Sequence, residues 1–146
     1  MSAGKAIAAD LRLAAQCLKD ARILAEGKSR NAAYLASQAA EHLVRAVSTS
    51  EGLHIERAKA HQIDTNIRSF PNENVDKKAF LNISTLEIYA TTYRYPTIAG
   101  RIIPTPAWDQ LEEELDRIEK LLALLFKHFG VDPASDGPAS SIRPRR

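Results

Sequence analysis

At 146 residues, the chain has the length of one typical domain. Its composition, 45% hydrophobic and 26% charged, excludes disorder over most of the chain, and a net charge of +2 is too small to indicate nucleic-acid binding by itself. A single cysteine, Cys17, excludes an intramolecular disulfide, and no apolar run approaches the roughly 20 residues that cross a bilayer. We therefore expect a cytoplasmic protein that does not enter a membrane.

Two amphipathic helices are predicted over residues 5–26 and 29–50, because apolar residues recur there every three or four positions. The inner face of the first is predicted to consist of Ile7, Leu11, Ala14, Leu18, Ala21 and Ala25. In the second, four polar side chains follow the same spacing beside the inner face: Tyr34, Gln38, Glu41 and Arg45.

Three further helices are predicted, a short one over 58–70, a long one over 75–93 and a last one from Thr105 to Phe129. Pro96 ends the fourth, because proline lacks an amide proton and disfavours helix at the preceding residue. No alternation typical of β-strands is found in the sequence. The predicted fold is therefore all-α, an up-and-down bundle of four long helices plus a short one.

The predicted domain covers residues 1–130, and a tail follows over 131–146. The tail is rich in proline, serine and arginine and has few apolar residues, so we expect it to be mobile.

Motifs for metal or phosphate chemistry are missing. The sequence has no His-Glu-x-x-His pair, no cysteine cluster and no glycine-rich phosphate loop. A di-metal bundle needs Glu-x-x-His pairs on two helices, and none is found. We therefore predict no metal site and no cofactor, and any nucleotide would be held by arginines, helix ends and aromatic rings.

The helix end at Tyr93-Arg94-Tyr95-Pro96 is the main candidate for a binding site. Two tyrosines flank Arg94, and together with Arg101 in the next loop they could hold a phosphate or a base. A structural alternative remains open, because an arginine at a helix C-terminus also complements the helix dipole. His61 has two readings as well, a titratable group near a ligand or a buried neutral imidazole.

Several stretches, in this order and spacing, resemble the HEPN domain family, the nucleotide-binding domains of higher eukaryotes and prokaryotes. The stretches are Asn31–Ala46, Gly52, Ala60-His61-Gln62-Ile63 and Leu86–Pro96, which ends in the Arg-Tyr-Pro form of the family motif. The likeness covers about residues 5–130. It implies a bundle of four to five helices, often dimeric, with a role near nucleotides or RNA.

The resemblance also implies two kinds of activity. Some members are metal-independent ribonucleases with an Arg-x(4–6)-His motif, and others partner minimal nucleotidyltransferases, commonly as toxin–antitoxin pairs. In this chain the fifth to seventh positions after Arg94 are Ala99, Gly100 and Arg101, so the histidine is missing. Arginine is a poor proton shuttle near neutral pH, and RNA cleavage needs a base and an acid. We therefore predict no catalytic residue.

The leading hypothesis is a non-catalytic nucleotide- or RNA-binding accessory module, a homodimer that works with a separate nucleotidyltransferase. Its candidate ligand-binding residues are Tyr34, Gln38, Glu41, Arg45, His61, Arg94, Tyr95 and Arg101. One alternative is a ribonuclease toxin with an unconventional Arg/His site. The other is a structural dimerisation domain, indicated by the Leu/Phe stripe of the last helix.

Overall fold

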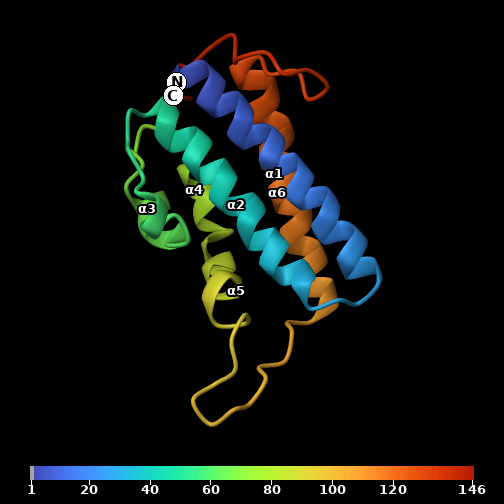
Figure 1. The fold of residues 1–146 in the computed structure, drawn as a ribbon. Coiled ribbons are helices and arrows are strands. Elements are labelled where there is room, and N and C mark those ends of the chain that lie inside the picture. Colours follow the sequence, from blue (N-terminus) through green and yellow to red (C-terminus); the bar gives the residue numbers. More distant parts are fainter. Residues whose placement is uncertain (1) are drawn as a thin grey trace.

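Three long helices form the body of the molecule in the computed structural model, which describes residues 2–146. They are α1 (Ala3–Glu26), α2 (Asn31–Ser50) and α6 (Trp108–Phe129). Figure 1 shows α1 and α2 running in opposite directions side by side, with α6 packed behind them. None of the described helices is long and apolar enough to cross a membrane.

Five short helical segments cover the other side of α2. They are η1 (Arg57–Lys59), α3 (Ile63–Arg68), α4 (Lys77–Leu81), η2 (Ser84–Leu86) and α5 (Glu87–Thr91). The described part of the chain contains helices and no strand, so the predicted all-α fold class is confirmed. The bundle is also of the predicted HEPN-like type.

Two of the predicted helices are divided in the structure. The predicted 58–70 helix is replaced by η1 and α3 with a turn between them, and the fourth helix is divided as well. Residues 75–93 form α4, η2 and α5 in succession instead of one long helix. The division falls at Asn82-Ile83-Ser84-Thr85, four residues with modest helix propensity. The Ser84 hydroxyl donates a hydrogen bond to the Leu81 carbonyl at 2.9 Å, and this local bond competes with the regular helical pattern.

The predicted apolar faces lie in the core. All six predicted residues of the α1 face are at most 6% exposed, and the alanines of α2 that face them are buried as well. Small alanine side chains allow these two helices to pack closely, which explains the extensive contact between α1 and α2. Most of the predicted α6 stripe is also buried, at Leu111, Leu115, Ile118, Leu122, Leu125 and Phe129, whereas Phe126 is only partly buried.

Residues 92–107 form a loop that projects beyond the end of the bundle (Figure 1). The last helix begins at Trp108, three residues after the predicted start at Thr105, and its N-cap residue, Ala107, has an extended ψ of 135°. Arg30 fastens both sides of the loop, since its Nη2 donates to the carbonyls of Tyr93 at 2.9 Å and Ile103 at 3.0 Å. These bonds fix the base of the loop beside the start of α2.

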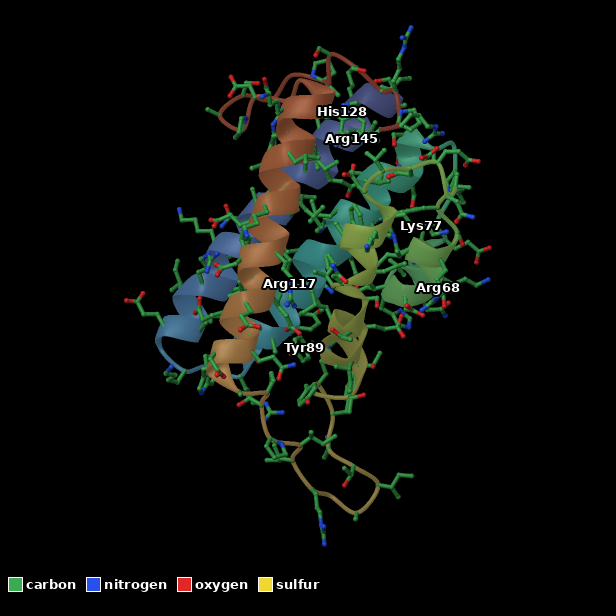
Figure 2. The ribbon with its side chains drawn as sticks, turned by 180° about the vertical axis from the view of Figure 1, so that it is seen from behind. Arg68, Lys77, Tyr89, Arg117, His128 and Arg145 are labelled. Atoms are coloured by element: carbon green, nitrogen blue, oxygen red, sulfur yellow. The ribbon has the colours of Figure 1, made fainter. Side chains whose placement is uncertain are left out.

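The 131–146 segment folds back over the opposite end of the bundle. Arg145 Nε lies 3.0 Å from Asp76 Oδ2, and Arg146 donates to both carboxylate oxygens of Glu51 at 2.7 and 2.8 Å. Figure 2 shows Arg145 at the same end as His128, far from Tyr89. These contacts show where the tail lies and do not measure its motion, so its mobility stays a prediction.

The tail contacts are expected to stabilise the fold. Replacing both Arg145 and Arg146 with alanine leaves the carboxylates of Asp76 and Glu51 without their cations, and the side chains of both acids are at most 6% exposed. We expect the midpoint of urea unfolding at pH 7 to fall, because an unpaired buried charge is costly. An unchanged midpoint would contradict this, and it is the result that a mobile tail would give.

Candidate functional site

A cavity of about 320 Å³ opens between the first half of α2, the η1 turn and the end of α5. Its lining residues are Tyr34, Gln38, Glu41, Arg57, Ala60, His61, Ala90, Thr91, Arg94 and Tyr95. Six of the eight predicted ligand-binding residues are in this set. The structure therefore brings together side chains from three parts of the sequence that the prediction had joined only by resemblance and spacing.

Helix geometry explains the α2 side of the cavity. Tyr34, Gln38 and Glu41 are separated by four and three residues, which places them on one face of the helix. The opposite wall comes from two breaks in helical structure. His61 lies in the turn between η1 and α3, and Arg94 follows the last turn of α5.

Arg94 is held between two aromatic rings. Its guanidinium carbon lies 4.6 Å from the centre of the Tyr34 ring and 5.3 Å from that of the Tyr95 ring. Cation–π contacts of this length favour an ordered side chain and leave the N–H groups available for hydrogen bonds. Within residues 2–146, neither Arg94 nor Arg57 makes an ion pair with a carboxylate. The cavity therefore offers two guanidinium groups to an anion.

Glu41 is the buried acid of the cavity. It is 9% exposed, and its Oε1 is covered and has no hydrogen-bond partner in the described structure. Burial raises the pKa of the Glu41 carboxyl, and the nearby His42 and His61 only partly offset this effect. A buried oxygen without a partner is uncommon in folded proteins, so it marks a place where a ligand group could bind.

Two predicted residues lie outside the cavity. Arg45 points instead toward α1, where its Nε is 3.7 Å from Asp10 Oδ1, and the same oxygen is 2.9 Å from His42 Nδ1. Arg101 is exposed in the projecting loop, where its backbone N–H donates to the Thr97 hydroxyl at 3.0 Å.

Sequence reasoning missed two polar residues of the cavity. Arg57 lies one residue before the predicted 58–70 helix and in the 3-10 turn η1, so no α-helical spacing groups it with His61. Thr91 lies one turn before Tyr95 at the end of α5, where the sequence alone shows only a helix surface.

His61 and Arg94 line the same cavity, which is consistent with the alternative of an Arg/His ribonuclease site. No group of three metal-binding side chains is found among the described residues.

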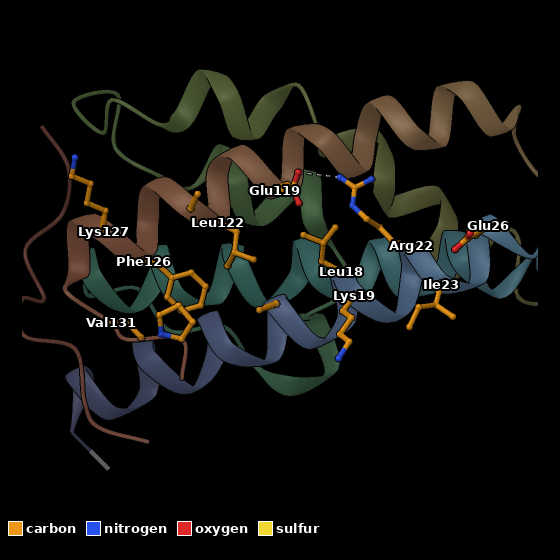
Figure 3. A pocket seen from close by; sticks show the side chains of 13 residues that line it. Leu18, Lys19, Arg22, Ile23, Glu26, Glu119, Leu122, Phe126, Lys127 and Val131 are labelled. Carbon is orange, nitrogen blue, oxygen red and sulfur yellow. Dashed lines mark hydrogen bonds and ion pairs between the residues drawn. The ribbon is translucent and has the colours of Figure 1, made fainter. Parts of the chain in front are cut away.

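A larger groove of about 800 Å³ lies between α1 and α6 (Figure 3). Its wall is mostly apolar and includes Leu18, Ile23, Leu122, Phe126 and Val131. Two of its charged residues, Arg22 and Glu119, form an ion pair at 3.2 Å, and Arg22 also donates to the carboxylates of Glu112 and Asp116 at 3.1 and 2.9 Å. None of the predicted site residues lines this groove. The larger hollow is therefore the α1–α6 groove, whereas the predicted polar residues gather in the smaller α2/η1/α5 cavity.

Glu114 is a second buried acid, on α6 and within hydrogen-bonding reach of Tyr89. It is 3% exposed, and its Oε2 has no hydrogen-bond partner in the described structure. Burial raises the pKa of Glu114, and hydrogen bonding by Tyr89 lowers it only in part. The pKa of Glu114 is therefore higher in the folded state than its unfolded value of about 4.5. Protonated Glu114 contributes its full stabilisation to the fold at pH values below about 4.5. This contribution is lost as the pH rises through the folded pKa.

The Glu114→Gln variant is therefore expected to gain stability relative to the wild type as the pH rises from 5 to 8. Glutamine cannot ionise, so the cost of burying a charge disappears. Urea unfolding of both proteins at the two pH values measures this difference. A difference in the free energy of unfolding that does not change with pH would contradict the prediction.

Comparison with known proteins gives one match. The HEPN domain family matches the chain over residues 9–129. Among curated proteins and among solved structures, nothing matches. The matched range begins in α1 and ends at the last residue of α6, so it takes in the whole bundle and the cavity. The chain belongs to the HEPN domain family.

Proposed function

We propose that this chain is a non-catalytic nucleotide- or RNA-binding accessory module and that the α2/η1/α5 cavity holds the ligand. The observation that carries the proposal is the pair of arginines, Arg57 and Arg94, that line one cavity and form no ion pair with a carboxylate among residues 2–146. Guanidinium groups of this kind bind phosphate oxygens with charge-assisted hydrogen bonds. The family membership supports a role near nucleotides or RNA.

The size of the cavity favours a small ligand. Pockets for small molecules generally measure about 300–1,000 Å³, and this one is at the lower limit with about 320 Å³. A mononucleotide, or one nucleotide of a single strand, fits such a volume better than a helix does. Tyr34 and Tyr95 supply ring faces, and Gln38 supplies an amide that can both donate and accept.

Calorimetric titration with mononucleotides and short single-stranded RNA tests the proposal. Binding of at least one of them with a stoichiometry near one per chain is expected. Absence of heat with every one of them would remove the ligand-binding function.

We also propose that the module acts in the cytoplasm as a homodimer with a separately encoded minimal nucleotidyltransferase, in a toxin–antitoxin-like pair. Members of the family often dimerise, and this supports the homodimer. Sedimentation analysis at micromolar concentration is expected to give twice the chain mass of 16.1 kDa. A mass that stays at 16.1 kDa throughout the micromolar range would contradict the homodimer.

A ribonuclease with an unconventional site is the second candidate, because His61 and Arg94 line the same cavity. His61 could move a proton while Arg94 stabilises the charged transition state. Incubating metal-free protein with short RNA tests it. Cleavage that disappears in His61→Gln would favour the nuclease, and intact RNA would remove it. The third alternative is a structural dimerisation domain. Most of the α6 stripe is buried in the chain's own core, whereas Phe126 is only partly buried and lines the open groove between α1 and α6.

A further inference from the structure

We infer that Glu41 makes the cavity selective for a guanine base. This inference deepens the proposed function and rests on it. Glu41 lines the cavity from α2, and it is the acid there that combines near-complete burial with an oxygen lacking any hydrogen-bond partner in the described structure. The other polar groups of the lining are cationic, neutral or aromatic.

The Glu41 carboxyl has a buried oxygen, Oε1, without a hydrogen-bond donor among the described residues. A carboxylate has two oxygens and can accept about four hydrogen bonds, so a buried Oε1 without a donor costs stability. Arg57 and Arg94 share the cavity with Glu41 but form no ion pair with it in the described structure. The terminal torsion of glutamate is broad, so a small rotation of the carboxyl turns either oxygen toward a ligand. A ligand with N–H donors would satisfy it.

The chemistry of the bases then decides among ligands. Guanine presents two donors side by side, N1–H and the amino group at C2, and these match the two oxygens of a carboxylate. Adenine and cytosine place a ring acceptor next to their amino group, and uracil places a carbonyl on each side of its N–H. Against a carboxylate, those acceptors repel the oxygen lone pairs, so one carboxylate distinguishes guanine from the other three.

The remaining polar groups suit the rest of a guanine nucleotide. Arg94 is ordered by the Tyr34 and Tyr95 rings with its N–H groups available, and Arg57 of η1 lines the same cavity. These two groups would bind the phosphate, which carries the opposite charge to theirs. An acid for the base and two cations for the phosphate give the ligand one orientation in the cavity.

Calorimetric titration of the wild-type protein with GMP, IMP, AMP and CMP tests the inference. GMP is expected to bind at least about tenfold tighter than AMP or CMP, because one mispaired polar contact costs about 1.4 kcal/mol or more. IMP keeps N1–H but lacks the C2 amino group, so its affinity is expected to lie between those of GMP and AMP. This series needs no variant, so it does not depend on whether a substitution folds.

The Glu41→Gln variant supplies the second arm, with the ratio of GMP to AMP affinity as its readout. The amide replaces one acceptor with a donor, so the ratio is expected to fall to near one. Glu113→Gln is the matched control, since Glu113 is exposed on α6, and it should keep the wild-type ratio. Equal affinities of the wild type for all four nucleotides would overturn the inference and leave the proposed function standing. Absence of binding by every nucleotide and by RNA would overturn the proposed function itself.

Discussion

Replacing Arg94 with alanine is expected to weaken nucleotide binding by about 10- to 150-fold, since hydrogen bonds to a charged group contribute about 1.5–3 kcal/mol. The side chain lines the cavity and is ordered by Tyr34 at 4.6 Å and Tyr95 at 5.3 Å. Calorimetry with a mononucleotide measures the effect. The fold should be unaffected, because Arg94 is an exposed residue at the end of α5.

Arg101→Ala is the matched control for Arg94→Ala. Both arginines belong to the segment around the projecting loop and carry the same charge, but Arg101 lines no part of the cavity. Its removal is expected to change the affinity less than about twofold at physiological salt, where distant exposed charges are screened. Equal losses in the two variants would mean that general charge, and not the cavity, holds the ligand.

Replacing Phe80 with alanine is expected to lower the free energy of unfolding by about 3–5 kcal/mol. Phe80 is fully buried and meets Phe70 edge to face, with ring centres 5.3 Å apart. The substitution removes the aromatic pair and leaves a cavity between α3 and α4, which a close-packed core fills only in part. Urea unfolding followed by circular dichroism measures the loss.

Phe126→Ala provides the comparison for Phe80→Ala. Phe126 is only partly buried and lines the open groove between α1 and α6, so water can occupy the space that its ring leaves. Its loss should be clearly smaller, about 1–2 kcal/mol on the basis of the apolar area involved. A larger loss for Phe126→Ala than for Phe80→Ala would contradict the packing described above.

The long helices could be predicted from the sequence because each contains enough turns for a periodic apolar stripe to stand out. All six residues predicted for the inner face of α1 are buried. The fourth helix could not be predicted as divided, because Phe80, Ile83, Leu86 and Ala90 keep helical spacing across the break. These four side chains keep that spacing because they all face the same core, although the backbone forms local turns at Asn82 and Ser84.

The sequence predicts the site residues well where they lie on one helix, α2, and less well where they lie in loops. Tyr34, Gln38, Glu41 and Arg45 share a face of α2, but Arg45 lies about 16 Å along the axis from Tyr34, at 1.5 Å per residue. The cavity covers only the first part of this stripe, and Arg45 contacts Asp10 of α1 instead. The position of Arg101 depends on the path of the projecting loop, which no periodicity encodes.

Chemical-shift mapping of a mononucleotide on the isotope-labelled protein tests most directly whether the α2/η1/α5 cavity is the ligand site. We expect the largest amide shifts on Gln38, His61 and Thr91, which come from three separate parts of the sequence and meet only at this cavity. Shifts on Ile23 and Phe126 instead would place the ligand in the α1–α6 groove and contradict a ligand site in the α2/η1/α5 cavity.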